Sequence, residues 1–268
     1  MKVSLNYNIP EPEKIDGGRF GLNEEIMKYL MNNCTIDRKY NQYLKDKSVI
    51  IVGPAAYMLE KEQGDFIESF DVVVRLNRGW KVKDEHKKNL GERTDIRYHC
   101  GMEHENNGGA WEIENMISQG VEWATIGFPR YLDYFHNDIL KFEDLNKQHN
   151  MNFHVFSDLE LYLSLHHYLG TRMSVGTISF ADLALYDFKR LHISGITFLD
   201  GGYFKSYKQS KEFDGPDAAF LESEIWKKHT DVGGHAMIPQ RKLLKLLSDI
   251  DDRITMDDEV KHVINKEQ

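Results

Sequence analysis

Residues 48–52 read Ser-Val-Ile-Ile-Val and are followed directly by Gly53 and Pro54. Four consecutive β-branched residues without polar alternation are typical of a strand that is buried on both faces, as in a parallel sheet. Gly53 lets a ligand approach the backbone at the carboxyl end of this strand, although a glycine here also fits an ordinary tight turn into a helix. The stretch predicts a central strand of an α/β protein.

Similar segments recur along the chain after this strand. Further strands are predicted at 71–75, 95–98, 123–126, 152–156 and 192–196. Helical patterns lie between them at about 109–119, 133–147, 158–167 and 176–189. Strands that alternate with helices predict βαβ units, whose ligands bind beyond the carboxyl ends of the strands. The expected fold is therefore α/β, with a Rossmann-like, mostly parallel sheet flanked by helices.

The composition limits the possible functions. Of 268 residues, 41% are hydrophobic and 29% are charged, which predicts a packed core. The net charge of −9 argues against a protein that coats nucleic acid. Two cysteines, Cys34 and Cys100, are too few for a disulfide framework or a four-thiolate zinc site, and we expect reduced thiols in a cytoplasmic protein rather than a single bridge. The first 18 residues do not resemble a signal peptide, and no apolar run is long enough to span a membrane.

Three motifs carry the functional signal. The first combines the strand and Gly53 with Gly64-Asp-Phe-Ile-Glu68, Asp71-Val-Val-Val-Arg75-Leu-Asn77 and Gly91-Glu-Arg-Thr94. The second is Ser174-Val-Gly176-Thr177, then a predicted helix and Leu191-His-Ile-Ser-Gly195. The third is Gly234-His235-Ala-Met-Ile-Pro239-Gln240, with Pro239 in the first turn of a helix.

Two of these motifs contain groups that suit a nucleotide. The carboxamide of Asn77, at a strand end, can donate to and accept from a base or ribose edge. A Ser-x-Gly-Thr turn that opens a helix presents N–H groups and hydroxyls to an anion. Ser174 equally fits an ordinary helix cap. The first motif lacks the spaced glycines of a dinucleotide-binding turn, which disfavours a Rossmann-type oxidoreductase.

Taken in order over about 190 residues, the motifs resemble the large, small and last sialyl motifs of glycosyltransferase family 29, the sialyltransferases. The chain is also similar to the bacterial sialyltransferases of family 42, with a strand end like Gly195-Ile-Thr-Phe198. The details around Asn77 and Thr94 favour family 29. The resemblance implies a GT-A-variant fold and an inverting enzyme that moves sialic acid, or the related 2-keto sugar acid Kdo, from a CMP donor to a glycan hydroxyl.

The resemblance also implies an organisation and a site. Residues 1–268 are expected to form a single glycosyltransferase domain: an arm and helix at 1–46, a nucleotide-binding core at 47–199, a lid and acceptor loop at 200–235 and a helical segment at 236–268. The implied donor-binding residues lie at strand ends, at the helix start and in the lid: Gly53, Asn77, Ser174, Gly176, Thr177, Tyr203 and Tyr207. His235 would be the general base, a task for which an imidazole with a pKa of about 6.5 is suited, and His229 is the fallback.

Some positions depart from the family pattern. Pro54 stands where Asn is usual, Gly202 where the third motif has His, and Gln240 where Glu is expected. These departures support an alternative, a CMP-binding protein of the same fold that has lost transferase activity. No metal is expected, because a CMP donor carries one phosphodiester that hydroxyls and helix N–H groups can stabilise. Asp249-Ile-Asp251 matches the Asp-x-Asp of metal-dependent transferases but is interpreted as a solvated helix end.

Overall fold

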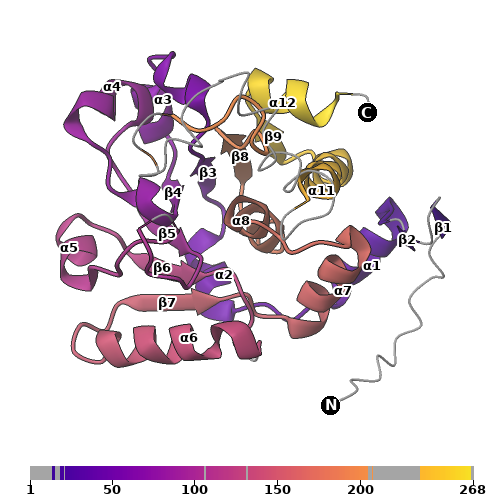
Figure 1. Cartoon of the computed structure of the whole chain (residues 1–268), viewed down its shortest axis with the longest axis horizontal. Coiled ribbons are helices and arrows are strands. Elements are labelled where there is room, and N and C mark those ends of the chain that lie inside the picture. Colours follow the sequence, from indigo (N-terminus) through magenta and orange to yellow (C-terminus); the bar gives the residue numbers. More distant parts are fainter. Residues whose placement is uncertain are drawn as a thin grey trace.

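The computed structural model describes residues 14–15, 19–20, 22–105, 107–130, 132–204, 207 and 236–266. Within these ranges a seven-stranded sheet forms the centre of the molecule (Figure 1). Its strands are β3 Ser48–Val52, β4 Val72–Leu76, β5 Ile96–His99, β6 Trp123–Ile126, β7 Asn152–Val155, β8 Arg190–Ser194 and β9 Ile254–Met256. Every neighbouring pair is parallel, in the order β7-β6-β5-β4-β3-β8-β9. The predicted α/β fold with a parallel sheet is confirmed.

Helices connect the strands. The α-helices are α1 Glu24–Asn33, α2 Arg38–Leu44, α3 Gly64–Glu68, α4 Lys87–Leu90, α5 Ile113–Ser118, α6 Asp133–Asn146, α7 Leu159–Leu169, α8 Val175–Leu183, α11 Met237–Ile250 and α12 Asp258–Ile264. The shorter 3-10 helices are η1 Ala56–Leu59, η2 Asn77–Trp80 and η3 Asp84–His86. A separate two-stranded antiparallel sheet consists of β1 Lys14–Ile15 and β2 Arg19–Phe20.

Local capping explains where several helices begin. The side-chain oxygen of Asn23 accepts a hydrogen bond from the N–H of Ile26 at 2.9 Å and so caps the start of α1. Asp257 caps α12 in the same way, through the N–H of Val260. Helix α7 ends at Gly170, whose φ of 61° lies in the left-handed region that favours glycine.

The strand order reverses between β3 and β8, the point where open α/β sheets bind ligands. Two glycines meet there. The N–H of Gly53 donates to the carbonyl of Ser194 at 2.7 Å, and a Cβ on Gly53 would overlap the carbonyl of Gly195. The two strand ends can approach this closely only because neither residue has a side chain.

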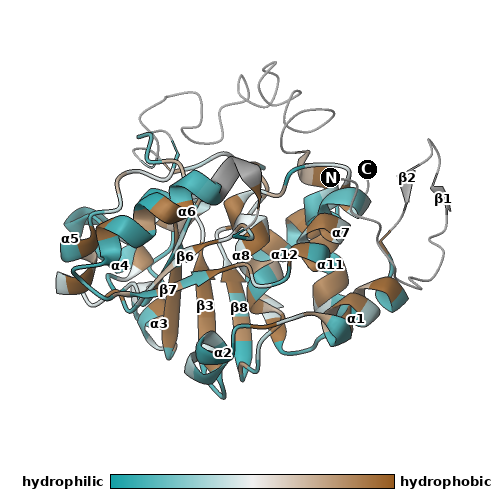
Figure 2. Ribbon diagram, turned by 90° about the horizontal axis from the view of Figure 1, so that it is seen from below, coloured by the Kyte–Doolittle hydropathy of each residue, from teal (hydrophilic) through white to brown (hydrophobic). Residues whose placement is uncertain are grey.

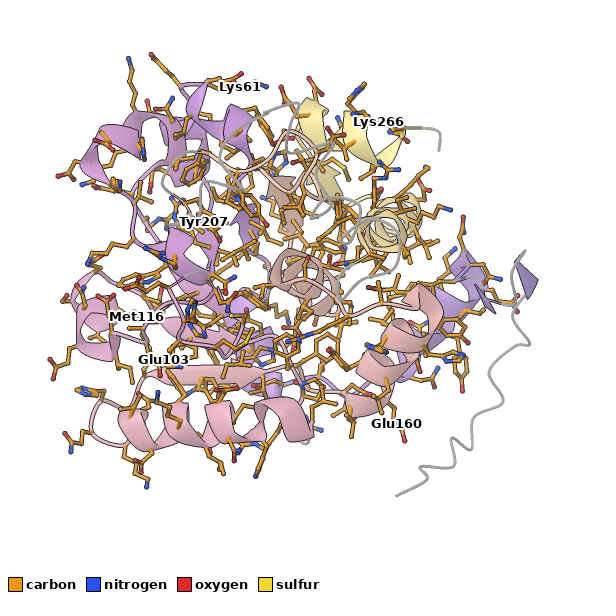
Figure 3. The ribbon with its side chains drawn as sticks, in the orientation of Figure 1. Lys61, Glu103, Met116, Glu160, Tyr207 and Lys266 are labelled. Atoms are coloured by element: carbon orange, nitrogen blue, oxygen red, sulfur yellow. The ribbon has the colours of Figure 1, made fainter. Side chains whose placement is uncertain are left out.

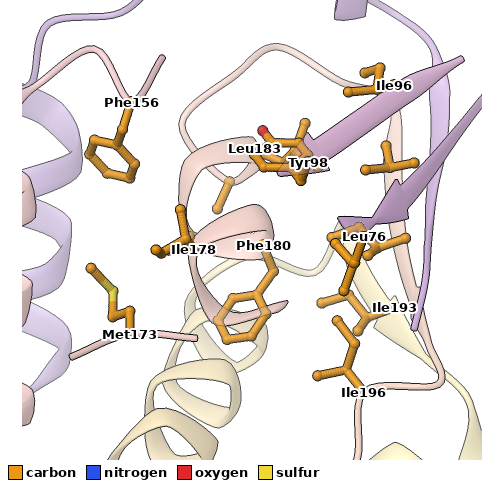
Figure 4. Close-up of a cluster of buried hydrophobic side chains, with 14 of the residues drawn as sticks. Leu76, Ile96, Tyr98, Phe156, Met173, Ile178, Phe180, Leu183, Ile193 and Ile196 are labelled. Carbon is orange, nitrogen blue, oxygen red and sulfur yellow. The ribbon is translucent and has the colours of Figure 1, made fainter. Parts of the chain in front are cut away.

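Alternate residues of the strands pack on opposite faces of the sheet. Ile50, Val52 and Val73 face a cluster that includes residues of η1, α3 and α4. Val49 and Val74 belong to the larger cluster, which contains residues of α1, α2, α8 and α11. Figure 4 shows part of this larger cluster, with side chains of α8 beside those of β4, β5 and β8. In Figure 2 the strand β3 is hydrophobic along its length, whereas α2 at the surface is largely hydrophilic.

Several elements differ from the sequence prediction, and three of them bear on the packing of the sheet. Helix α8 was expected over 176–189 but ends at Leu183. The reason is tertiary, because Asp187 exchanges two hydrogen bonds with the side chain of Asn41 in α2. Helix α2 was not predicted, and neither was β9. Since β9 pairs with β8, the segment 236–268 is not wholly helical as predicted but also supplies an edge strand.

Candidate functional site

Asn77 lies at the carboxyl end of β4 in a strained conformation, with a φ of 50°. Its side-chain oxygen accepts from the N–H of Cys100 at 2.9 Å. Its carbonyl accepts from Nε of Arg97 at 3.0 Å. These two bonds hold the residue against the end of β5 and orient its carboxamide, so that its NH2 group lies on the side away from Cys100.

Arg97 and His99 of β5 anchor the loop that follows their strand. The buried guanidinium of Arg97 donates to the carbonyls of Gly108 and Ala110 at 2.8 and 3.0 Å. Burial lowers its pKa to about 9. His99 is also buried, and its burial together with the charge of Arg97 keeps its pKa well below 6.5. The imidazole is therefore neutral, and it donates from Nε2 to the carbonyl of Gly109 and accepts at Nδ1 from an N–H.

The start of α8 is built from Ser174 and Thr177. The hydroxyl of Ser174 accepts from the N–H of Thr177 at 3.2 Å and lies 3.0 Å from the Thr177 hydroxyl. Ser174 is therefore the helix cap that the sequence allowed. Thr177 is fully buried, and its hydroxyl donates to Gln240 at 2.6 Å. Gly176 brings this first turn against Leu76, because a Cβ on it would lie 3.6 Å from that side chain.

The chain after β8 returns to the end of β3. The N–H of Ala56 donates to the carbonyl of Gly202, and the N–H of Phe204 donates to the carbonyl of Pro54, at 3.1 and 2.9 Å. This short antiparallel pairing places Tyr203 beside the carboxyl end of β3. Pro54 therefore keeps a backbone role at the position where the family usually has Asn.

Tyr203 and Tyr207 come together above the strand ends. Their ring centroids are 5.2 Å apart, and the Tyr207 hydroxyl donates to the carbonyl of Leu76 at 3.2 Å. Burial raises the pKa of Tyr203 to about 12 and raises that of Tyr207 as well, so both phenols keep their protons at neutral pH.

The structure thus brings together most of the residues predicted for the site. All of the following lie at the carboxyl ends of β3, β4 and β8 or on the segments packed there: Gly53, Asn77, Ser174, Gly176, Thr177, Tyr203 and Tyr207. His235 and His229 lie outside the described residues. Ala236, which follows His235 directly, donates its N–H to the Thr171 hydroxyl at 2.7 Å.

Two further residues support this region: Gln240, which the sequence marks only as a departure from the family pattern, and Asp257, which the sequence does not signal. Gln240 joins α11 to the start of α8. Asp257 accepts from the hydroxyls of Tyr57 and Ser194 at 2.5 and 2.8 Å, and from the N–H of Gly195 at 3.3 Å. It thereby fixes the turn after β8. Their partners are 60 to 200 residues away in sequence, and no local pattern signals such contacts.

A depression of about 1210 Å³ opens beside the ends of β4 and β5. Tyr207 and Glu103, both labelled in Figure 3, line it from different loops. Many of its charged groups are paired, for example Lys87 with Asp84 and Glu92 at 3.0 and 2.7 Å. Residues 78–84 complete much of its wall. Tyr207 lines the depression, whereas Gly53 and Ser174 do not.

In the described part of the chain, no group of three or more His, Cys, Asp or Glu residues could hold a metal ion. Asp249 and Asp251 pair instead with Lys245 and Arg253, at 2.9 and 2.7 Å, around the end of α11. Among the same described residues, no helix has the length and apolar character needed to cross a membrane.

One family of known proteins matches part of the chain. The model of glycosyltransferase family 29 (sialyltransferase) matches residues 14–114. This range contains the whole first motif, from Val49 to Thr94. The predicted resemblance to family 29 is therefore confirmed over this range, and with it the class of enzyme, a glycosyltransferase of the sialyltransferase type. No curated protein matches the chain.

Several solved structures are similar to the chain. One is a mammalian sialyltransferase in complex with Gal-beta-1-3GalNAc-ortho-nitrophenol, with 12% identity and a TM-score of 0.48 over 88% of this chain and 80% of that one. Another is the sialyltransferase CstII from Campylobacter jejuni in complex with the substrate analogue CMP-3FNeuAc, with 18% identity and a TM-score of 0.49 over 78% and 81%. A third is the alpha-2,3-sialyltransferase from Campylobacter jejuni in apo form, with 14% identity and a TM-score of 0.49 over 85% and 79%.

Proposed function

We propose that the protein is an inverting glycosyltransferase that moves sialic acid, or the related Kdo, from a CMP donor to a glycan hydroxyl. The observation that carries the proposal is that two motifs about 100 residues apart meet at one place. Leu76, the neighbour of Asn77 in the first motif, lies beside Gly176 of the second, and Gly176 also lies beside Ile196, just after β8, next to the point where the strand order reverses. This is the position at which open α/β sheets bind nucleotides.

The donor would lie across the strand ends with its phosphate toward the start of α8. The first N–H groups of a helix have no partner within the helix, and the helix dipole favours an anion there. Gly176 packs this turn against the end of β4, where even an added Cβ would lie 3.6 Å from the side chain of Leu76. The protonated phenols of Tyr203 and Tyr207 would stabilise the leaving phosphate, Tyr207 by exchanging its hydrogen bond to the Leu76 carbonyl for one to the phosphate.

His235 would act as the general base. The acceptor oxygen attacks the anomeric carbon, the bond from that carbon to the CMP oxygen breaks, CMP leaves with the electron pair, and the imidazole takes the acceptor proton. The bond from Ala236 to Thr171 supports this role, because it fixes the residue next to His235 beside the segment that leads into α8.

The depression beside Tyr207 would receive the acceptor glycan. Its walls include Phe204, from the expected acceptor loop, and Glu103 and Gly109, from the loop after β5. We also propose that the transfer needs no metal, because the single phosphate of CMP can be stabilised by hydroxyls and N–H groups.

A further part of the proposal concerns the chain as a whole. The strands at 48–52 and 254–256 belong to one sheet, which supports a single glycosyltransferase domain. Cys34 and Cys100 are both free thiols, which supports a cytoplasmic location.

The test is the release of CMP from CMP-sialic acid and from CMP-Kdo in the presence of a panel of glycan acceptors. We expect release with one of the donors, in EDTA as well as without it, and its loss in His235→Ala. The matched control is His262→Ala, because His262 is exposed on α12. Equal rates for the two variants would exclude His235 as the base.

Thermal shifts with CMP, UDP, GDP and NAD separate the remaining alternatives. Stabilisation by CMP alone supports the nucleotide assignment. CMP binding without turnover of either donor would instead favour a binding protein that has lost transfer, as Pro54 and Gly202 allow.

A further inference from the structure

Gln240 is fully buried in α11, at the position where the family's last motif has Glu, and every hydrogen-bonding group of its carboxamide is used. The side-chain oxygen accepts from the N–H of Ser174 at 2.7 Å and from the hydroxyl of Thr177 at 2.6 Å. The side-chain nitrogen donates to the carbonyls of Ala236 and Arg172 at 2.8 and 3.4 Å. An amide has two lone pairs on oxygen and two N–H groups, so these four bonds complete its capacity.

The hydrogen-bond partners determine which end of the Gln240 carboxamide is the oxygen and which is the nitrogen. A backbone N–H such as that of Ser174 can only donate, and a carbonyl such as that of Ala236 can only accept. A carboxylate in this place would direct a second acceptor oxygen at two carbonyls. The site therefore requires an amide, and Gln240 matches its hydrogen-bond partners better than the Glu of the family motif would.

These bonds connect two elements that pack side by side, α8 and α11 (Figure 1). They hold the N-terminal residue of the motif, Ser174, and they determine the direction of the Thr177 hydroxyl. Because Thr177 donates its only hydroxyl proton to Gln240, its oxygen is left to accept from the Ser174 hydroxyl at 3.0 Å. The first turn of α8 is thus held by a residue that does not itself face the strand ends.

We propose that Gln240 is a positioning residue for the CMP donor, which acts by holding the first turn of α8 through an amide that an acid cannot replace at neutral pH. This inference rests on the proposed function, because it assumes that the first turn of α8 binds the donor phosphate. It explains why a departure from the family motif is compatible with activity.

The test compares CMP affinity by calorimetry for the wild type and Gln240→Glu between pH 5.5 and 8.5. At pH 8.5 the introduced carboxylate repels two carbonyls, and we expect CMP to bind about tenfold more weakly than to the wild type. Burial raises the pKa of such a carboxyl group, and the protonated acid can again donate one hydrogen bond. The affinity ratio should therefore fall toward one at pH 5.5.

Because the two proteins are compared at the same pH, the ratio of their CMP affinities does not depend on the titration of CMP or of groups that both proteins contain. Among the described residues, the atoms bonded to Gln240 belong to backbone groups, the Thr177 hydroxyl and the thioether of Met237, none of which titrates in this range. Gln148→Glu is the matched control, since Gln148 is exposed. It should bind CMP like the wild type at every pH.

Each outcome is decisive. Equal CMP affinity of the wild type and Gln240→Glu, or a loss that is the same at every pH, overturns the inference and leaves the proposed function intact. A wild type that does not bind CMP overturns the proposed function and the inference with it. If Gln240→Glu does not fold, Gln240→Met replaces it, because methionine has a similar length and makes neither the bond to Ser174 nor the bond to Thr177: we expect it to bind CMP more weakly than the wild type, and equal binding overturns the inference.

Discussion

His154 carries a prediction about alkaline pH. The imidazole is fully buried in β7 between two carboxylates, with Nε2 2.9 Å from Asp182 of α8 and Nδ1 3.2 Å from Asp37 at the start of α2. Tyr40 stacks on the ring at 4.1 Å, and the Tyr98 hydroxyl donates to Asp182 at 2.7 Å. Burial by itself would lower the pKa of His154, but the two carboxylates raise it to about 9.

The sign of the effect follows from linkage. The pKa in the folded protein, about 9, lies above the ordinary value of 6.5, so the folded state binds the proton more tightly. The stabilisation is complete below pH 6.5 and is lost as the pH rises through about 9. At about 1.4 kcal/mol for each pH unit, the interval corresponds to about 3 kcal/mol of unfolding free energy.

Urea denaturation between pH 6 and 10 measures this contribution when the wild type is compared with His154→Phe/Asp182→Asn. The double variant is needed because a buried Asp182 without its partner would itself bind a proton and imitate the slope. We expect the wild type to lose about 3 kcal/mol relative to the double variant over this range. His262→Phe, at an exposed position, should keep the wild-type slope.

An NMR titration of the His154 ring gives the same information directly and does not depend on the stability of any variant. A ring that loses its proton below pH 7, or parallel stability profiles for wild type and double variant, would refute a charged His154. A confirmed pair would also explain how α8 is held against β5 and β7, since Asp182 lies on the helix that begins at Ser174.

Two further pairs of substitutions, each a test with its control, concern the turns at the strand ends. Gly53→Ala should lower the unfolding free energy by about 2 kcal/mol or more because the new Cβ overlaps the carbonyl of Gly195, whereas Gly176→Ala, with ordinary contacts of 3.5 to 3.6 Å, should change it by less than about 1 kcal/mol. Similar changes for the two variants in urea denaturation would contradict the close approach of Gly53 and Gly195 as the cause. Asp257→Ala should lower the unfolding free energy by about 2 to 4 kcal/mol, because it removes the cap of α12 and the hydrogen-bond acceptor of Ser194 and Gly195. Asp258→Ala, at an exposed neighbouring position, should change it little, and equal melting temperatures for the two variants would argue against a structural role of Asp257.

Much of the candidate site could be predicted because its residues lie next to strong local signals. Asn77 follows a strand of five buried residues, and Ser174 opens an apolar helix. Parallel strands end at one edge of a sheet, so residues that follow them must lie near one another. Gln240 and Asp257 could not be found in this way, because only the packing of α11 and α12 brings them to α8 and β8.

The sequence by itself determined the six strands from β3 to β8 and their parallel arrangement, most clearly at β3 and β4, which are almost continuously apolar because they are buried on both faces. It also determined the order of the three motifs. Only the tertiary structure decided that Ile254–Met256 pairs with β8, that α8 stops at Leu183 and that the amide of Gln240 is matched to Ser174 and Thr177. These features depend on hydrogen bonds between residues far apart in the chain, and such bonds leave no periodicity in the sequence.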